Sequence, residues 1–216
     1  MMIRFALLAA LVATPAIAGE GWRRLATPDD RQRLRGWRSA WMEALPAARA
    51  GGGRDTIARE AALFDPDRAL DGPMPPAGAY RCRTFKLGGR SAGFTPFAWS
   101  RCRVEGDGRF SRVDGPQRPV GVIHPDTSGR AVFLGTLALG GERRPLAYGR
   151  DRARDMAGVV ERVGERRWRV VLPYPRFEST LDVIELVPDS VGTTGGGTTA
   201  GLGATAGAGS GGNAAR

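Results

Sequence analysis

Two patterns of hydrophobic and polar positions divide the chain. Between residues 19 and 72, apolar residues recur every three or four positions, which is the period of an amphipathic helix. From residue 73 to residue 188, apolar and polar residues alternate between turn-forming glycines and prolines, which is typical of short antiparallel strands. We therefore predict an α+β protein in which an N-terminal helical segment packs on a mostly antiparallel β-barrel of about eight to nine strands.

The helical segment contains two predicted helices. The first begins after Thr27, which can cap it, with Pro28 at the first helical position, and it runs to about residue 48. The glycines at 51–53 end this helix, and a shorter one is expected over residues 56–64. The apolar stripe of the first helix consists of Leu34, Trp37, Trp41 and Leu45.

The barrel segment contains nine predicted strands, separated by turns rich in Gly, Pro and Asp. The hairpin around residues 163–166 has the clearest signal, with Gly164 where a type II′ turn requires a positive φ. The strands are expected near residues 78–87, 96–104, 109–113, 118–123, 130–139, 144–149, 156–163, 167–172 and 180–187.

The first eighteen residues have the three parts of a secretory signal peptide. Arg4 supplies the positive charge, residues 5–13 form a short apolar stretch, and Ala16-Ile17-Ala18 is a small-x-small cleavage site. The stretch is shorter than the roughly 20 residues of a membrane-spanning helix. Cleavage after Ala18 predicts a periplasmic or secreted protein whose mature part has no transmembrane segment.

Residues 189–216 consist mainly of Gly, Ala, Thr and Ser. Such a sequence buries too little apolar surface to offset the entropy lost on ordering, so a disordered tail is predicted. The predicted organisation is therefore a signal peptide at 1–18, a helical segment at 19–72, a barrel at 73–188 and the tail at 189–216.

The chain is positively charged: it has 32 basic and 22 acidic residues, which give a formal net charge of +10. Lys86 is the only lysine. So complete a preference for arginine is typical of GC-rich coding sequence and does not by itself indicate a nucleic-acid-binding surface. We expect no specific nucleic-acid partner.

Cys82 and Cys102 are the only cysteines. In an oxidising compartment such a pair is expected to form a disulfide. A crosslink that closes a loop of about 20 residues contributes on the order of 3 kcal/mol. The alternatives are a metal site or a reactive thiol, but two cysteines and the distant His124 are too few ligands for a metal. We expect a disulfide, no metal and no cofactor.

Six groups of residues together resemble one family, the domain of unknown function 4893, which consists of uncharacterised secreted bacterial proteins. The resemblance covers residues 22–188, and it implies a secreted location and these domain limits but no activity. The segment 78–80 after a helix also resembles, more loosely, the architecture of calycin or lipocalin-like barrels. The six groups are Trp22-Arg23-x-x-Ala26-Thr27 with Asp30-Arg31, Arg35-x-Trp37-Arg38-x-Ala40-Trp41, Tyr80-Arg81-Cys82-Arg83 with Lys86-Leu87-Gly88, Val132-Phe133-Leu134-Gly135-Thr136, Glu161-Arg162-x-Gly164, and Phe177-Glu178-Ser179-x-Leu181-Asp182-Val183-Ile184-Glu185-Leu186.

Few catalytic groups are present in the sequence. His124 is the only histidine, it precedes a Pro-Asp turn, and no nucleophile or phosphate-binding motif occurs. We therefore assign no catalytic residue. The carboxylates Glu178 and Asp182 are kept as an alternative. A strand would place them on one face, where a hydrolase could use them for acid–base catalysis. Surface ion pairs with the many arginines are the alternative explanation of these acids.

Aromatic residues of the barrel segment are candidates for lining a ligand cavity. They are Tyr80, Trp99, Tyr148 and Trp168, together with Phe133. A barrel of eight strands can enclose one small ligand or be filled by its own side chains, so core packing is the alternative.

Charged residues of the same segment are further candidates. Three Arg-x-Arg pairs, at positions 81/83, 101/103 and 167/169, each place two positive charges on the sheet face opposite Cys82. If their strands are neighbours they form a basic stripe, and Arg81 and Arg83 of this stripe could bind an anionic ligand. A solvated charged face is the alternative. Glu185 lies among apolar residues, so it either pairs with an arginine such as Arg81, Arg83 or Arg169 or contacts a ligand.

These observations favour a non-enzymatic binding module of the cell envelope that takes a small apolar or anionic ligand. A hydrolase that uses the carboxylate pair is one alternative. A structural or interaction protein that uses the Trp37/Trp41 helix as a contact surface is the other.

Overall fold

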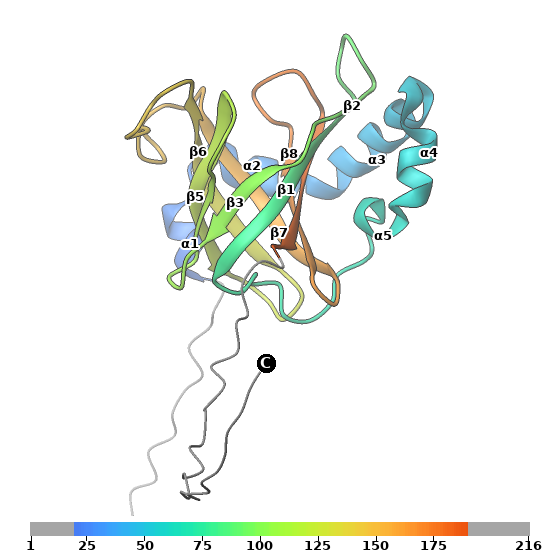
Figure 1. Ribbon diagram of the computed structural model, residues 1–216. Coiled ribbons are helices and arrows are strands. Elements are labelled where there is room, and N and C mark those ends of the chain that lie inside the picture. Colours follow the sequence, from blue (N-terminus) through green and yellow to red (C-terminus); the bar gives the residue numbers. More distant parts are fainter. Residues whose placement is uncertain (1–19, 190–216) are drawn as a thin grey trace, which may run out of the picture.

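The computed structural model describes residues 20–189, which form a closed β-barrel with helices on one side (Figure 1). The predicted signal peptide at 1–18 and the predicted tail beyond residue 189 lie outside the described residues. Within residues 20–189, no helix combines the length and apolar character needed to cross a membrane.

Helices make up the first part of the described chain: α1 (Glu20–Leu25), α2 (Pro28–Arg35), α3 (Trp37–Ala48), α4 (Arg54–Arg59) and α5 (Ala61–Phe64). Thr27 caps α2 as expected, because its hydroxyl accepts a hydrogen bond from the Asp30 amide at 3.2 Å. The predicted first helix is divided at Gly36. A further helical turn, η1 (Arg49–Gly53), follows α3. The helical backbone is interrupted within it at Gly52, whose φ of +91° favours glycine.

Nine strands follow: β1 (Gly78–Leu87), β2 (Phe94–Pro96), β3 (Ser100–Val104), β4 (Arg109–Arg112), β5 (Gln117–Pro125), β6 (Ala131–Leu139), β7 (Asp155–Gly164), β8 (Arg167–Pro173) and β9 (Leu181–Pro188). Neighbouring strands are antiparallel, and β1 also pairs with β9, so β1 and β3 to β9 close an eight-stranded barrel. The short β2 is an extra strand that pairs with the end of β1. The predicted α+β barrel is confirmed.

Two details of the strand prediction are wrong. Residues 144–149 form a loop, and their one aromatic side chain, Tyr148, donates a hydrogen bond to Asp30 of α2 at 2.5 Å. The 163–166 hairpin exists, but Gly164 does not have the expected positive φ. It is the last residue of β7, where the register shifts by one residue after Arg162 and leaves the turn to the two residues that follow.

The lower end of the barrel in Figure 1 is the end where β1 begins and β9 ends. Inward-facing side chains fill this end. The segment before β1 covers this end. The Tyr80 hydroxyl donates to the carbonyl of Pro76 at 2.6 Å, and the Trp168 indole donates to the carbonyl of Gly72 at 3.2 Å. The buried interior residues include Tyr80, Phe110, Ile123, Phe133, Val160, Trp168, Val170 and Leu186.

The disulfide between Cys82 and Cys102 lies inside this filled end and confirms the prediction. It joins β1 to β3 with a Cα–Cα distance of 5.8 Å. Both residues belong to the interior cluster and are almost inaccessible to solvent. The crosslink therefore reinforces the strand pair that begins the barrel.

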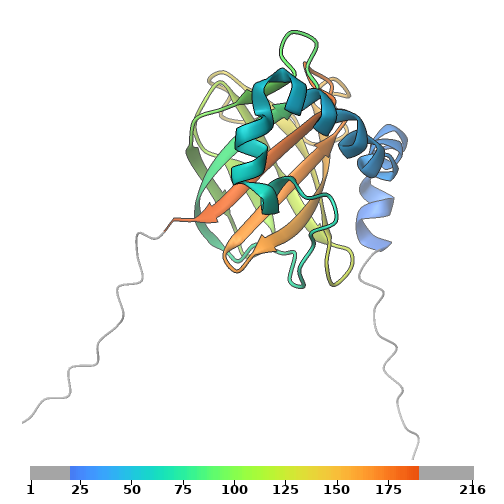
Figure 2. The same ribbon diagram turned by 90° about the vertical axis from the view of Figure 1, so that its right-hand side faces the viewer.

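Helices cover the outer face of one side of the barrel (Figure 2). The helices α3 to α5 pack on β1, β8 and β9, where Trp41, Leu63 and Phe85 are almost completely buried. A second layer brings α1 and α2 against the outer faces of β6 and β7. Trp41 is inaccessible to solvent and Trp37 packs against both layers, so the molecule itself occupies the proposed Trp37/Trp41 contact surface.

Candidate functional site

A pocket opens at the upper end of the barrel, where β1 ends and β9 begins. It lies between the barrel wall, the β8–β9 loop and α2, and its empty volume is about 710 Å³, which includes space open to solvent. Its apolar lining consists of Phe97, Pro119, Leu137, Ala153, Met156, Ala157, Leu172, Pro175, Phe177 and Ile184.

Charged side chains also line this pocket: five are basic (Arg33, Lys86, Arg112, Arg154 and Arg176) and two are acidic (Asp155 and Asp182). Carboxylates outside the pocket lining pair with four of the basic groups, all except Arg112. Over the described range of the chain, the Arg112 side chain has neither an ion pair nor a hydrogen bond, and its buried Nε lacks an acceptor. Among the basic groups of the pocket, Arg112 is therefore the one without a carboxylate partner in the described residues.

Buried polar atoms without a partner are concentrated at the pocket. Six such side-chain atoms occur in residues 20–189, and three of them, Arg33 Nε, Arg112 Nε and Asp155 Oδ2, belong to its lining. Buried polar groups are nearly always hydrogen-bonded, and leaving one unsatisfied costs about 1–3 kcal/mol. These atoms are suited to contacts with a polar ligand.

Asp182 is the buried acid of the barrel mouth. It lies on β9 opposite Lys86 of β1, and only 7% of the residue is exposed. Burial raises the pKa of its carboxyl group to about 6, although the Ser179 hydroxyl, which donates to it at 2.5 Å, and the Lys86 charge act in the opposite direction. The Lys86 ammonium group donates instead to Glu178 at 2.8 Å. Asp182 therefore changes charge within about one pH unit of neutrality.

The β8–β9 loop beside the pocket contains two non-glycine residues in the left-handed region, Tyr174 (φ +46°) and Glu178 (φ +69°). Such residues cost on the order of 1–3 kcal/mol and often occur at ligand-binding sites. Between them, Pro175, Arg176 and Phe177 line the pocket. Ion pairs from Arg176 to Asp29 and from Glu178 to Lys86 tie this loop to α2 and β1.

The structure places none of the seven predicted ligand-binding residues on the wall of this pocket. Tyr80 and Trp168 belong to the filled lower end. Tyr148 is in the β6–β7 loop, and Trp99 is on the surface before β3. Ligand contact by these residues stays a prediction. The pocket residues Arg112 and Asp182 were not among the candidates for ligand binding.

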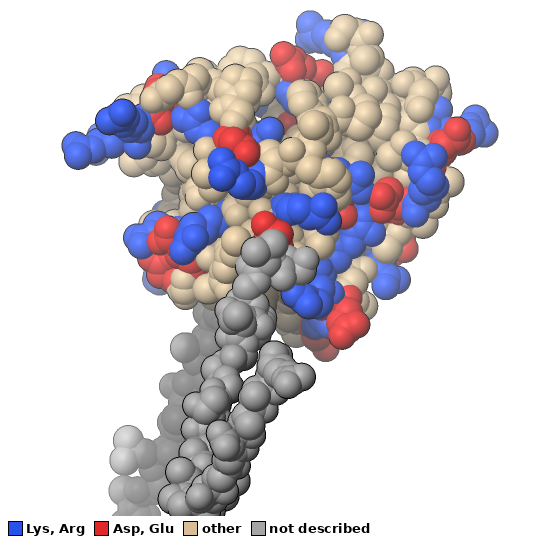
Figure 3. Space-filling model, viewed as in Figure 1, with Lys and Arg blue, Asp and Glu red and all other residues tan. Residues whose placement is uncertain are grey.

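The expected basic stripe is divided between two environments. Arg81, Arg101 and Arg103 lie on the exposed face of β1 and β3, with the Arg81 guanidinium 5.0 Å from the Trp99 ring. Acidic side chains lie beside several basic ones on this side of the molecule (Figure 3), and Arg101 pairs with Asp114. This part of the stripe has the character of a solvated charged surface.

The other part of the stripe lies beneath the helices as a row of alternating charge. Strand register places Glu161 opposite Arg169, Arg169 opposite Glu185, and Glu185 opposite Arg83. Glu185 is almost fully buried, and its carboxylate pairs with Arg83 and Arg167, each at 2.5 Å. The contacts that the structure gives Glu185 are thus ion pairs within the protein.

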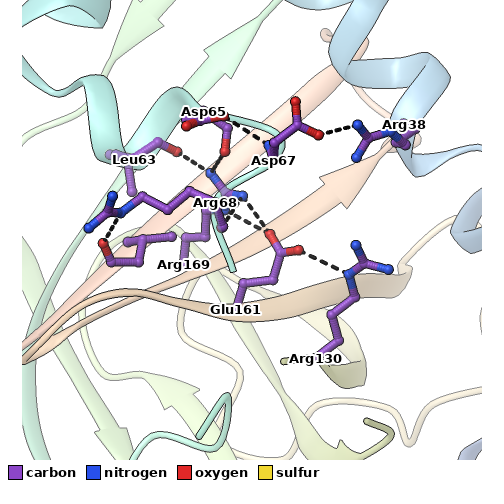
Figure 4. Close-up of polar contacts among 9 residues, drawn as sticks. Arg38, Leu63, Asp65, Asp67, Arg68, Arg130, Glu161 and Arg169 are labelled. Atoms are coloured by element: carbon purple, nitrogen blue, oxygen red, sulfur yellow. Dashed lines mark hydrogen bonds and ion pairs between the residues drawn. The ribbon is translucent and has the colours of Figure 1, made fainter. Parts of the chain in front are cut away.

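Arg169 joins the barrel to the segment that follows α5 (Figure 4). Its guanidinium is inaccessible to solvent and donates to Glu161 at 2.6 Å. It also donates to the main-chain carbonyls of Leu63, Asp65 and Arg68 at 2.8, 2.7 and 3.1 Å. All these partners belong to the chain itself, so this cluster is structural.

The carboxylates of the proposed hydrolase pair are in different environments. Glu178 lies in the loop before β9, so the expected shared strand face is wrong. Its side chain is 65% exposed, and the bond from Lys86 lowers its pKa, whereas burial raises the pKa of Asp182. Within residues 20–189, no group of three or more His, Cys, Asp or Glu side chains could hold a metal ion.

Comparison with known families gives a match to the family described as Domain of unknown function (DUF4893), over residues 22–186. This range contains both helical layers, almost all of the barrel and all the pocket residues. Neither the curated proteins nor the solved structures contain a match.

Removing the Arg169 charge is expected to destabilise the fold strongly. Arg169→Met leaves Glu161 buried without this partner, which should lower the free energy of unfolding by about 3–5 kcal/mol. The exposed Arg103 provides the control, and Arg103→Met should change it by less than about 0.5 kcal/mol. Urea unfolding followed by tryptophan fluorescence measures both, and equal losses would contradict the structural role of Arg169.

The raised pKa of Asp182 predicts a pH-dependent effect of the Asp182→Asn substitution. Because this pKa is about 6 in the folded protein, against 3.8 for an unperturbed aspartate, the wild type loses stability as the pH rises through this range. Asn cannot ionise, so the variant should gain about 2 kcal/mol relative to the wild type between about pH 4.5 and about pH 7.5. Urea unfolding at both pH values tests this, with Glu178→Gln as the exposed control. A pH-independent difference would contradict burial of an ionisable Asp182.

Proposed function

The chain belongs to the DUF4893 family, whose description names no reaction, and we propose that it is a non-enzymatic binding module that holds a small amphipathic molecule by its anionic group at the upper end of its barrel. The observation that carries this proposal is Arg112, a cation to which no residue between 20 and 189 is bonded, in a largely apolar pocket. A guanidinium group is charged at every physiological pH and binds carboxylate or phosphate through two parallel hydrogen bonds.

The rest of the pocket supports an amphipathic ligand. Aromatic and aliphatic side chains provide surface for a hydrocarbon skeleton, and the five basic groups outnumber the two acidic ones. Because the lower end is filled by the core, a ligand has access from the upper end only as far as the apolar side chains of Leu172 and Ile184.

We place this binding outside the cytoplasm, in the periplasm or in the secreted fraction. The sequence pattern of residues 1–18 supports this location. A buried disulfide between Cys82 and Cys102 is also in keeping with an oxidising compartment.

Hydrolysis by Glu178 and Asp182 is the weaker candidate. Their pKa values are shifted in opposite directions, as in many acid–base pairs. General acid–base catalysis, however, requires both carboxylates at one substrate bond. Glu178 is mostly exposed and paired with Lys86, so binding explains the pocket better than hydrolysis does.

The anion-binding role predicts how a fluorescent probe responds to the loss of Arg112. The probe is 8-anilinonaphthalene-1-sulfonate, which carries aromatic rings and one anionic group. Arg112→Met should weaken its binding by about tenfold or more, because a hydrogen bond to a charged group contributes about 1.5–3 kcal/mol. Arg103→Met should leave the affinity unchanged. Fluorescence titration of folded protein measures both, and equal affinities for the wild type and Arg112→Met would contradict the proposed function.

A further inference from the structure

We infer that the ligand of the barrel mouth is a zwitterion whose anionic group binds Arg112 and whose ammonium group binds Asp182. This inference rests on the proposed function, since it names the chemical class of ligand for the same pocket. It depends on two side chains of opposite charge that line one pocket from separate strands, each without a charged partner bonded to it within residues 20–189.

The cationic side of the pocket is Arg112 at the end of β4. Its four basic neighbours in the lining, Arg33, Lys86, Arg154 and Arg176, each have a carboxylate within 3.2 Å. Arg112 alone retains its full hydrogen-bonding capacity, including the buried Nε. The guanidinium geometry suits a planar carboxylate more closely than it suits a point charge.

The acidic side of the pocket is Asp182 on β9, which is more than nine-tenths buried. Its single hydrogen bond in the described chain comes from Ser179 to Oδ1, and the other oxygen has no donor. Lys86 lies opposite in the strand register but donates to Glu178. A buried carboxylate without a cation is strongly disfavoured, so a ligand ammonium group would supply the missing partner.

Asp155, the other acid of the lining, is in a different position. It lies at the start of β7 beside α2, and burial raises the pKa of its carboxyl group. The Gly149 amide, which donates to its Oδ1 at 2.8 Å, and the positive charge of Arg33 act in the opposite direction. Within residues 20–189, the Asp182 carboxyl group accepts no main-chain amide hydrogen bond, and its one donor is the Ser179 hydroxyl. We therefore assign the ammonium group to Asp182.

The arrangement of strands favours a ligand with separated charges. In the sheet order, β4 and β9 are separated by β3 and β1, so Arg112 and Asp182 lie on different parts of the barrel wall. Apolar side chains of Leu137, Leu172 and Ile184 share the lining with them. A molecule with a short hydrocarbon chain between a carboxylate and an ammonium group matches this distribution.

Three probes with the same six-carbon chain test this inference: 6-aminohexanoate, hexanoate and hexylammonium. Isothermal titration calorimetry with the whole mature chain at neutral pH should show that 6-aminohexanoate binds at least about tenfold more tightly than either singly charged probe. Asp182→Asn should remove its advantage over hexanoate, and Arg112→Met should remove its advantage over hexylammonium. Arg103→Met should preserve both advantages.

The outcomes separate this inference from the proposed function. If hexanoate binds as tightly as 6-aminohexanoate and still depends on Arg112, the zwitterion is excluded and the anion-binding function stands. If none of the probes binds and Arg112→Met leaves the affinity of the aromatic sulfonate unchanged, both proposals fail. The comparison of the three probes on the wild-type protein decides the question even where a variant does not fold.

Discussion

Pairing between the first and last strands of the barrel is the constraint on which the other features depend. β1 and β9 pair from Tyr80 opposite Pro188 to Leu87 opposite Leu181, and this pairing closes the barrel. The register places Arg83 beside Glu185 under the helices and Lys86 beside Asp182 in the mouth. Since a shift of one residue would exchange the two faces of a strand, the buried charge row and the pocket depend on the same register.

The two ends of the barrel differ because the inward-facing residues change in character along each strand. On β1 they pass from Tyr80 and Cys82 at the lower end to Thr84 and Lys86 at the upper end. On β9, Leu186 lies at the lower end and Asp182 at the upper end. Large apolar side chains therefore close one end, and charged side chains keep the other end accessible. The same strands therefore carry a packed core at one end and a partly polar pocket at the other.

Local sequence patterns were sufficient to predict most of the fold. Alternation predicted nine strands, and eight of them are present in the structure. The secretory pattern together with the two cysteines predicted the disulfide. The loop at 144–149 was mistaken for a strand, although Leu146 and Ala147 are exposed. Its Tyr148 packs against the helices α1 and α2 and bonds to Asp30, a contact that the local pattern does not contain. Likewise, alternation placed Arg81 and Arg83 on one face, but only the docking of the helices decides which of them is covered.

The pocket was harder to predict because its lining comes from α2, seven of the strands and the loops beside them. In the sequence, Arg112 resembles any surface arginine, and only the closed barrel shows that none of the described side chains pairs with it. Asp182 did carry a local signal, because it is an acid between Leu181 and Val183, as Glu185 is between Ile184 and Leu186. That signal was assigned to a ligand or an ion pair for Glu185 and to a catalytic pair for Asp182.

Binding at the barrel mouth is tested most directly by locating a ligand on the folded protein. Amide ¹H–¹⁵N NMR spectra recorded during titration with 8-anilinonaphthalene-1-sulfonate would show which residues respond. If the ligand enters the mouth, the largest shifts will belong to Thr84, Lys86, Arg112, Leu137, Asp182 and Ile184. Shifts confined to the exposed face with Arg81, Trp99, Arg101 and Arg103 would contradict binding inside the barrel.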